Sequence, residues 1–445
     1  MRRALFDVSG LVQWYAYLSN PSGIQRVMES ILSQPALLRN PAVTLVSRAI
    51  GSDTFYIVEP DIIAGLVTRA TRRASIARLR GLFAESMRLA EPMRLLHEMH
   101  SIHVPYIALG FSFTERFWES RCAGRWTARA SKLRTIAPDD AYDALVGLGD
   151  FWCHGGHVPA LITLKRRSGA KLIHLVHDLI AAVNPQWTHP HYGKQFLDQF
   201  GSLAPAVDHW LVTSTYVGGQ LAGYLDQQGL SGRPIDTMPM GWPEPLPIQD
   251  DDSVLAKHGL ERQRFLMHVG TVEPRKNLDG LFDALGRLRS EEAVSALPCV
   301  LVGRDGWRSE TIRQRLKDDP WLASRVKWIK DAPDGDLAAL YRSARFTVVP
   351  SFDEGWGLAV QESLAHRTPC IAARVGGIPE AGLDLVDYVE SGDTDALAAA
   401  IRTLANDGDA LERARARIIG GLAATPLPAW SDTADRLAGL LGVDP

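Results

Sequence analysis

The sequence predicts an α/β protein with two doubly wound domains, each built around a parallel sheet. The chain has 445 residues, a length that makes two domains the default. Short apolar segments bounded by Gly, Pro or Asp alternate with helical patterns through most of the sequence. Such segments are typical of buried parallel strands joined by helices, and here they fall into two sets.

The expected strands are short, and most are apolar on both faces. A strand at residues 1–7 opens the chain. The first set then comprises residues 44–47, 144–147, 171–176 and 209–213, and the second set comprises residues 265–269, 299–302, 326–329, 346–349 and 370–373.

A proline-rich segment separates the two sets and predicts a domain boundary. Residues 242–247 contain three prolines, which remove backbone donors and cannot continue a helix or a central strand. We therefore predict an N-terminal domain at residues 1–248 and a C-terminal domain at residues 249–445. The acidic run Asp250–Asp252 is expected to be a solvated linker patch and not a metal site. The helical pattern at residues 431–441 ends the chain, and a return of this last helix to the N-terminal domain stays open.

Composition excludes several classes of protein. A net charge of −3 argues against a dedicated nucleic-acid binder. The four cysteines, at positions 122, 153, 299 and 370, have no CxxC spacing, so they are expected to be reduced thiols and not a disulfide or zinc framework. No apolar stretch is long enough for a signal peptide or a membrane span. These features favour a cytoplasmic protein.

Residues 61–100 are rich in arginine and have interleaved apolar residues. The favoured interpretation is an ordinary helical region with one solvated and one buried side. The alternative is peripheral docking on the inner face of the cytoplasmic membrane, where each clustered cation contributes roughly 1 kcal/mol.

A pair of glutamates is the most informative feature. Glu354 opens the turn Glu-Gly-Trp-Gly after the expected strand 346–349, and Glu362 lies inside the helix that follows. Such a turn directs unpaired backbone N–H groups and the positive end of a helix dipole at an anion. Glutamates beside it can accept hydrogen bonds from hydroxyls, so the segment suits a nucleotide sugar. A stabilising charge at a helix start would explain Glu354 alone, but it explains Glu362 poorly.

Two cations follow the first strand of the second set. Arg275 and Lys276 stand in the sequence Glu-Pro-Arg-Lys-Asn, and Asn277 is a candidate cap for a helix with apolar residues at helical spacing. Adjacent cations at a strand–helix junction would neutralise a diphosphate. An isolated Arg-Lys pair is more often a solvated surface feature.

The N-terminal half offers a histidine and a turn. His177 follows the expected strand 171–176, whereas His174 points to the opposite face and is expected to be packed in the interior. Gly23, ahead of a helix, would allow a close ligand approach, and a simple helix cap by Ser22 is an equally good interpretation.

These segments together resemble the retaining glycosyltransferases of family GT4, which have the GT-B fold: two Rossmann-like domains facing across a cleft. The resemblance is strong over residues 265–382 and looser over residues 1–30 and 171–215. It implies that Glu354 contacts the donor sugar, Glu362 the ribose and residues 355–358 the diphosphate. Trp356 replaces the usual Phe, and Thr271 stands where many relatives have arginine, a loss that Arg275 or Arg304 could offset.

The resemblance implies three groups of site residues, with no metal and no cofactor. The catalytic group is His177, Arg275, Lys276 and Glu354. The donor-binding group is Gly23, Gly270, Gly303, Arg304, Lys330, Gly355, Trp356, Gly357, Leu358 and Glu362. The acceptor group is Arg26, His189 and His191.

The implied reaction moves a hexose from a nucleotide sugar to a hydroxyl of a glycan acceptor with retention of configuration. The first expectation for the donor is GDP-mannose, with a UDP-sugar or GDP-fucose as alternatives. The expected acceptor is a bacterial surface glycan such as a lipopolysaccharide chain, free or lipid-linked. A hydrolase or phosphorylase, and a non-catalytic nucleotide-sugar-binding regulator, remain alternatives. A nicotinamide oxidoreductase is disfavoured because no GxGxxG turn follows the first strand.

Overall fold

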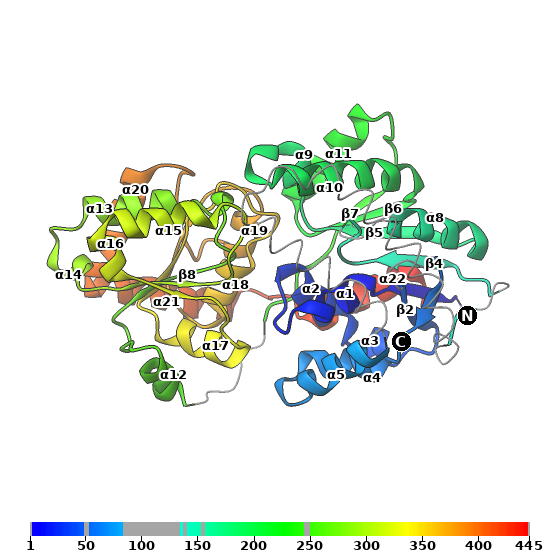
Figure 1. Ribbon diagram of the computed structural model, residues 1–445, viewed down its shortest axis with the longest axis horizontal. Helices are drawn as coiled ribbons and strands as arrows, with labels where there is room; N and C mark the ends of the chain where they lie inside the picture. The colour runs from blue at the N-terminus through cyan, green and yellow to red at the C-terminus, as the bar shows by residue number, and fades with distance from the viewer. Residues whose placement is uncertain are drawn as a thin grey trace.

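The computed structural model describes residues 2–48, 53–82, 134–136, 140–152, 156–243 and 250–443. It contains two α/β units lying side by side, each with one sheet (Figure 1). The predicted fold class is confirmed. The predicted boundary between residues 248 and 249 lies outside the described residues.

The N-terminal sheet has seven strands in the order β3-β2-β1-β4-β5-β6-β7. All neighbouring pairs are parallel except β2 with β3. The strands are β1 (Ala4–Asp7), β2 (Val43–Arg48), β3 (Phe55–Ile57), β4 (Ala144–Gly147), β5 (Lys171–Val176), β6 (His209–Val212) and β7 (Ile235–Thr237).

The C-terminal sheet has six parallel strands in the order β10-β9-β8-β11-β12-β13. The strands are β8 (Leu266–Val269), β9 (Cys299–Val302), β10 (Val326–Ile329), β11 (Phe346–Val349), β12 (Cys370–Ala373) and β13 (Asp387–Val389). Strand order reverses between β8 and β11, because the chain runs outward to β10 and then returns beside β8. Ligands bind at such reversals, beyond the carboxyl ends of the strands.

Helices cover both faces of each sheet, as parallel strands require. In the first half of the chain they are α1 (Ser9–Tyr17), α2 (Gly23–Leu32), α3 (Pro35–Leu38), α4 (Pro60–Val67), α5 (Arg69–Leu82), α8 (His157–Ser168), α9 (Ile180–Val183), α10 (Pro190–Leu203) and α11 (Thr215–Gln227). In the second half they are α12 (Asp251–Lys257), α13 (Leu278–Arg287), α14 (Glu292–Ser295), α15 (Ser309–Asp318), α16 (Pro320–Arg325), α17 (Asp334–Ser343), α18 (Leu358–Ala365), α19 (Ile378–Gly382), α20 (Thr394–Asn406), α21 (Gly408–Ala424) and α22 (Trp430–Leu441).

The last helix packs on the N-terminal sheet. Leu437 and Leu441 of α22 are buried in the same apolar cluster as Ala4 and Phe6 of β1. In Figure 1 this helix, red, lies among the blue N-terminal elements. Along the described elements, the chain therefore passes from one unit to the other after β7 and again before α22.

The expectation of a solvated acidic linker at Asp250–Asp252 is right for the exposed Asp250 and Asp252, but wrong for Asp251 and for the linker itself. The carboxylate of Asp250 caps α12 by accepting from Ser253 N. Asp251 is only 5% exposed and forms an ion pair of 2.6 Å with Arg342. An acidic residue before a helix is a strong cap, so this run begins the first helix of the C-terminal unit.

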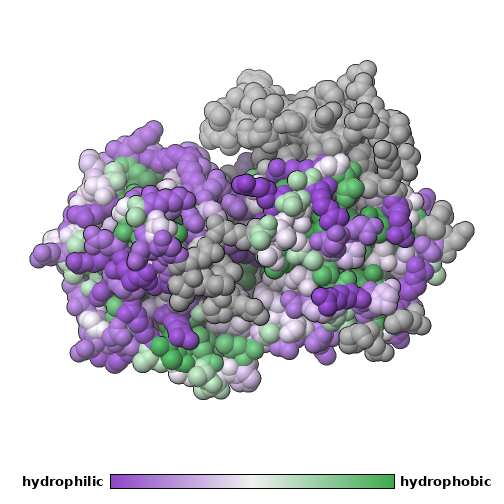
Figure 2. Space-filling view, turned by 90° about the horizontal axis from the view of Figure 1, so that it is seen from below, coloured by the Kyte–Doolittle hydropathy of each residue, from purple (hydrophilic) through white to green (hydrophobic). Residues whose placement is uncertain are grey.

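The arginine-rich region is described only as far as residue 82, so its second half lies outside the described residues. In α5, Ile76 and Leu79 are buried while Arg73 and Arg78 are exposed, which agrees with the favoured interpretation of one buried and one solvated side. Arg72 departs from it, because it is largely buried and donates to the Tyr15 hydroxyl and to Glu29. On the face in Figure 2, hydrophilic residues predominate over the C-terminal unit. In the described ranges, no helix has the length and apolarity to cross a bilayer.

Candidate active site

The carboxyl ends of β8 and β11 lead into two segments that meet at the strand-order reversal. β8 is followed by the short 3₁₀ turn η4 (Pro274–Lys276), and β11 by the glycine-rich turn before α18. Asn277 joins them: its side chain accepts from Gly280 N to cap α13, as predicted, and donates to the carbonyl of Pro350 over 3.1 Å. The predicted anion-binding turn and the predicted cations are thus brought together.

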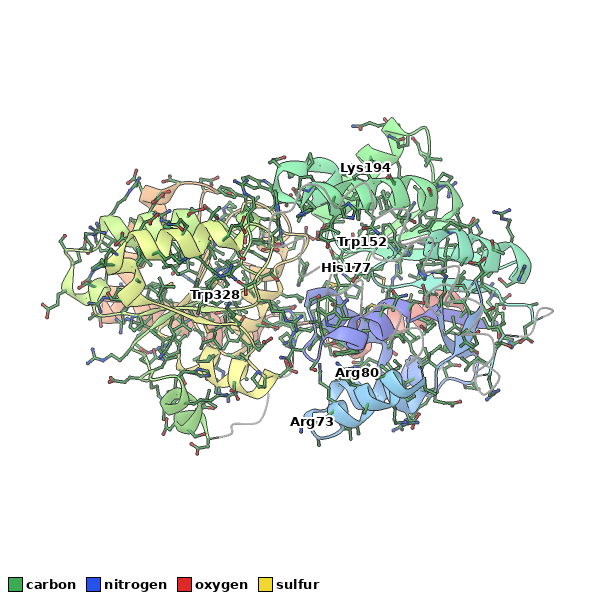
Figure 3. The ribbon with its side chains drawn as sticks, viewed as in Figure 1. Arg73, Arg80, Trp152, His177, Lys194 and Trp328 are labelled. Carbon is green, nitrogen blue, oxygen red and sulfur yellow. The ribbon has the colours of Figure 1, made fainter. Side chains whose placement is uncertain are left out.

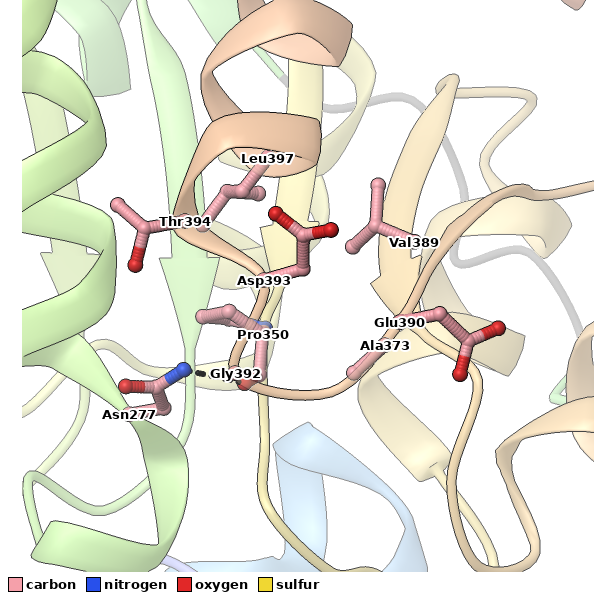
Figure 4. Close-up of a pocket in the computed structure, with 9 residues that line it drawn as sticks. All are labelled: Asn277, Pro350, Ala373, Val389, Glu390, Gly392, Asp393, Thr394 and Leu397. Atoms are coloured by element: carbon pink, nitrogen blue, oxygen red, sulfur yellow. Dashed lines mark hydrogen bonds between the residues drawn. The ribbon is translucent and has the colours of Figure 1, made fainter.

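A small pocket lies beside this Asn277 hydrogen bond (Figure 4). Its volume of about 10 Å³ holds about one water molecule, so it is too small for a sugar or a nucleotide. It is lined by Asn277, Pro350, Ala373, Val389, Glu390, Gly392, Asp393, Thr394 and Leu397.

Both cations contact the first glutamate of the pair. Lys276 Nζ lies 2.5 Å from Glu354 Oε1, and Arg275 Nη1 lies 2.7 Å from Glu354 Oε2. Ser351 Oγ donates to Glu354 Oε1 over 2.8 Å, and Arg275 also pairs with Glu273 at 2.8 Å. Burial alone would raise the pKa of Glu354, but the two cations hold it well below its usual value. Glu354 is therefore a carboxylate throughout the physiological pH range.

The second glutamate has a different environment. Glu362, in α18, accepts a hydrogen bond of 2.9 Å from the hydroxyl of Tyr341. Burial raises its pKa, while the nearby charge of Arg26 opposes this shift. The two glutamates thus differ. The charge of Glu354 is neutralised by two close cations, whereas Glu362 accepts a hydrogen bond from Tyr341 and can accept others from a ligand.

The backbone N–H groups of the turn are available. Among the described residues, no hydrogen bond is donated by the backbone N–H groups of residues 355–357, which directly precede α18. Unpaired N–H groups and a helix dipole at one place attract an anion, as the sequence predicts for this turn.

His177 lies on the side of the N-terminal unit that faces the C-terminal unit (Figure 3), and its backbone meets this turn. A Cβ on Gly355 would lie 2.1 Å from the His177 carbonyl oxygen, so the two backbones touch. His177 Nε2 lies 2.7 Å from the carbonyl of Leu148, and burial lowers the pKa of His177 to about 4. A neutral ring that donates through Nε2 can orient a hydroxyl, but it carries no positive charge for charge stabilisation. His174 is buried against Phe151 and Trp210, as expected.

The Gly23 turn also faces the site. A Cβ at Gly23 would lie 3.3 Å from Leu358 Cδ1 in the first turn of α18. Ser22 does not cap α2 through its side chain, so that interpretation is wrong. Arg26 donates to Asp334 over 2.6 Å, and its charge acts on Glu362. The structure therefore places Arg26 beside a donor-binding candidate, which does not support its prediction as an acceptor residue.

The remaining donor-binding candidates lie at the ends of β8, β9 and β10. Gly270 and Gly303 are in direct contact, because a Cβ on Gly303 would lie 1.9 Å from the Gly270 carbonyl oxygen. Arg304 donates to the carbonyl of Asn20 over 2.6 Å, so it bridges the two units. Lys330 is half-exposed and pairs with Asp305 at 2.8 Å.

The predicted acceptor histidines lie on a segment that contacts the C-terminal unit. His189 packs at 5.9 Å from the ring of Trp307, and its Nδ1 accepts from the backbone N–H of His191. Just before them, Trp187 stacks on Phe352 at 4.5 Å. Among the described residues, no cluster of three or more His, Cys, Asp or Glu side chains could hold a metal ion, so His189 and His191 belong to no such cluster.

The roles of Glu380 and Ser214 are not predicted by the sequence. The carboxylate of Glu380 accepts from the backbone N–H groups of Thr215 and Tyr216, at 2.8 and 3.0 Å, and so caps a helix of the other unit. Ser214 Oγ donates to the carbonyl of Gly355 over 2.7 Å. Glu380 ends the sequence Gly-Gly-Ile-Pro-Glu, which marks a turn before a helix. The local sequence does not identify the residues in the other unit that Glu380 contacts.

Comparisons with known proteins agree with this arrangement. Residues 250–419 match the family model described as "Glycosyl transferases group 1". The chain is 34% identical over 182 residues to an O-antigen chain mannosyltransferase B of Escherichia coli, which covers 40% of this chain and 46% of that protein. It is 29% identical over 315 residues to a D-inositol 3-phosphate glycosyltransferase of Segniliparus rotundus, covering 69% and 68% of the two chains. The match thus spans about half of the length of the E. coli relative.

Solved structures share the fold over three quarters or more of the chain. The Anabaena protein Alr3699/HepE in complex with UDP-glucose matches with a TM-score of 0.59 and 14% identity, covering 99% of this chain and 100% of that chain. Sucrose-phosphate synthase from Thermosynechococcus elongatus matches with a TM-score of 0.52 and 21% identity, covering 76% and 79%. Residues 250–419 therefore resemble the glycosyl transferases group 1 family, and the chain has the GT-B fold.

Proposed function

We propose that this protein is a retaining hexosyltransferase of the GT4 type. It takes a sugar from a nucleoside diphosphate donor and transfers it to a hydroxyl of a glycan acceptor. The observation that carries the proposal is the meeting of three elements: the Glu354 turn, the cations Arg275 and Lys276, and His177 from the other domain.

The donor would bind chiefly to the C-terminal domain. Its diphosphate lies against the N–H groups of residues 355–357 and the two cations, and its ribose lies at Glu362. As the bond to the sugar breaks, negative charge grows on the leaving nucleoside diphosphate. Preorganised donors at that position stabilise the charge, and removal of one costs about 100-fold or more in rate.

The anomeric configuration is proposed to be retained because the acceptor hydroxyl attacks the sugar from the same face as that from which the nucleoside diphosphate leaves. The leaving phosphate then accepts the proton of the acceptor hydroxyl. Without a donor, both oxygens of Glu354 are bonded to the cations and Ser351. Glu354 is no nucleophile in this scheme, because in the donor complex its carboxylate accepts from the hydroxyls of the sugar. His177, neutral and fixed by Leu148, orients the sugar.

GDP-mannose is the proposed donor, and a bacterial surface polysaccharide the proposed acceptor. Support comes from the E. coli relatives, whose names are O-antigen chain mannosyltransferase B and serotype-specific mannosyltransferase WbdA. The Anabaena structures contain UDP or UDP-glucose, so a UDP-sugar is the alternative donor.

A two-stage experiment tests the proposal. A thermal-shift screen with GDP, UDP, ADP and dTDP identifies the nucleotide, because a ligand that binds only the folded state raises the melting temperature. The matching nucleotide sugar is then incubated with and without a glycan acceptor, and the anomeric configuration of the product is read by NMR.

Lys276→Ala should weaken donor binding and lower turnover, whereas Lys317→Ala, an exposed lysine in α15, should change neither. Release of free sugar from the donor without acceptor transfer would indicate a hydrolase. Tight nucleotide binding without turnover of any donor would contradict the enzyme and indicate a binding protein. An inverted product would contradict the retaining mechanism alone.

A further inference from the structure

We propose that Glu354 is an internal competitor of the donor diphosphate, and that this competition favours the nucleotide sugar over free nucleoside diphosphate. The inference rests on the proposed function of this site and specifies how the site discriminates substrate from product. The carboxylate holds Lys276 and Arg275 until a diphosphate takes them, and it is then released toward the sugar hydroxyls.

The contacts of Glu354 are those of a bound anion. Its two oxygens divide the cations between them, with Oε1 at 2.5 Å from Lys276 and Oε2 at 2.7 Å from Arg275. Ser351 adds a third hydrogen bond at 2.8 Å to Oε1. A diphosphate also presents several oxygens to several donors, so the carboxylate occupies positions suited to phosphate oxygens.

Burial makes the exchange selective for an anion. The side chains of Glu354 and Lys276 are each 12% exposed, and that of Arg275 is 17% exposed. Removing one partner of such a pair leaves an uncompensated buried charge, which is strongly unfavourable. Only a ligand that brings its own negative charge can therefore displace the carboxylate from the two cations.

The exchange must occur by rotation of the side chain, because the backbone of Glu354 is fixed. Its carbonyl accepts from Gly377 N over 2.8 Å. A Cβ on Gly376 would lie 2.2 Å from the same carbonyl oxygen, so the two backbones are in contact. The three bonds of the carboxylate are all made by side chains, and they can be replaced without moving the turn.

The consequence is a dependence of phosphate binding on the sugar. A nucleoside diphosphate displaces Glu354 and leaves a buried carboxylate with fewer partners. A nucleotide sugar displaces it and offers hydroxyls that donate to the freed carboxylate. Glu354 thus weakens binding of the product more than binding of the donor, which promotes product release.

The test compares Glu354→Gln with the wild type by isothermal titration calorimetry. The probes are inorganic pyrophosphate, GDP with GDP-mannose, and UDP with UDP-glucose. A neutral amide cannot hold the cations as a carboxylate does, so pyrophosphate and the nucleoside diphosphate should bind about tenfold tighter, the scale of one charged hydrogen bond. The nucleotide sugar should gain less or bind more weakly. Affinities for pyrophosphate and nucleoside diphosphate that stay equal or fall would overturn the proposal.

Glu362→Gln is the matched control, because this glutamate contacts Tyr341 and makes no ion pair among the described residues. It should not tighten pyrophosphate binding, and a similar gain there would contradict the role assigned to Glu354. Circular dichroism and melting temperature report folding of each variant. If Glu354→Gln does not fold, Glu354→Asp, shorter by one methylene, loses reach to both cations and should show the same gain.

The outcomes separate this inference from the proposed function. Tighter pyrophosphate binding in a protein that transfers no sugar would uphold the competition and refute the enzyme. If the wild type transfers sugar but Glu354→Gln binds pyrophosphate no more tightly than the wild type, the proposed enzymatic function is supported and the competition by Glu354 is refuted.

Discussion

One added carbon at Gly355 would test whether contact between the domains is needed for transfer. A Cβ at this position would lie 2.1 Å from the carbonyl oxygen of His177 and 3.0 Å from the Cβ of Asp178. The φ of Gly355 is not positive, so alanine fits the local backbone. Any effect of Gly355→Ala therefore comes from the contact with the other domain and not from strain within the turn.

The size of the effect follows from that contact. Side-chain carbons do not approach other atoms more closely than 3.0 Å, so the domains must separate by about 1 Å at this point. A displacement of about 1 Å between reacting groups costs about 100-fold in rate. Binding of the nucleoside diphosphate should change little, because Lys276, Arg275 and the free N–H groups of residues 355–357 all belong to the C-terminal domain.

The assay measures kcat/KM for transfer, the Kd of the nucleoside diphosphate and the radius of gyration by small-angle scattering. Gly219→Ala is the control, since Gly219 lies in α11 with no atom within 4 Å of the added carbon. Alanine in a helix is stabilising by up to about 1 kcal/mol and should leave transfer unchanged. Wild-type kcat/KM in Gly355→Ala would refute the reasoning. Parallel loss of binding, transfer and melting temperature would indicate misfolding instead.

Three further changes have expected outcomes. Glu380→Ala removes two hydrogen bonds between the domains, those from the first-turn N–H groups of α11, at about 1 kcal/mol for each bond. It should raise KM and the radius of gyration, and unchanged scattering would contradict a role of these bonds in holding the domains together. Tyr341→Phe removes the hydrogen bond to Glu362 and should weaken nucleotide binding more than kcat, so a fall in kcat at constant affinity would argue against the ribose role. His177 takes up its proton near pH 6.5 when unfolded and near pH 4 when buried, so its contribution to stability is lost as pH falls through that window. In His177→Gln, the free energy of unfolding should decrease less steeply as pH falls from 6.5 to 4, by up to about 1.4 kcal/mol per pH unit. A slope equal to that of the wild type would contradict the lowered pKa of His177.

The strands that the sequence predicts are those whose signal is local. Each of the ten expected segments became a strand, because two apolar faces and short length mark a buried parallel strand. β3, β7 and β13 were missed. Each has three residues at or near a sheet edge, and β7 and β13 are only partly buried, so neither length nor apolarity distinguishes them from loops.

The candidate site divides in the same way. Lys276, Arg275 and the Glu354 turn could be predicted together because each lies in the connection that follows a strand, and adjacent parallel strands bring such connections to one edge of the sheet. The contacts between the domains could not be predicted. Arg26 and Asp334 are 308 positions apart, and their pairing depends on how two independently folded sheets face each other. For the same reason, the sequence does not predict the contact between Glu380 and the backbone of Thr215.

The positions where the chain crosses between the domains decide how such contacts can form and break. Trp242 N donates to the carbonyl of Pro428 over 2.8 Å, so the two crossing segments run side by side. Gly241 lies directly under Trp430, since a Cβ there would be 2.4 Å from the indole ring. Among the described residues, no other segment of the chain passes from one domain to the other, so a change in the angle between the domains is expected to be absorbed at this paired crossing. The contacts of Gly355 and Glu380 lie away from it on the facing surfaces, and the phosphate-binding turn is itself one of those surfaces. Donor binding at the turn and closure of the domains are therefore expected to be coupled.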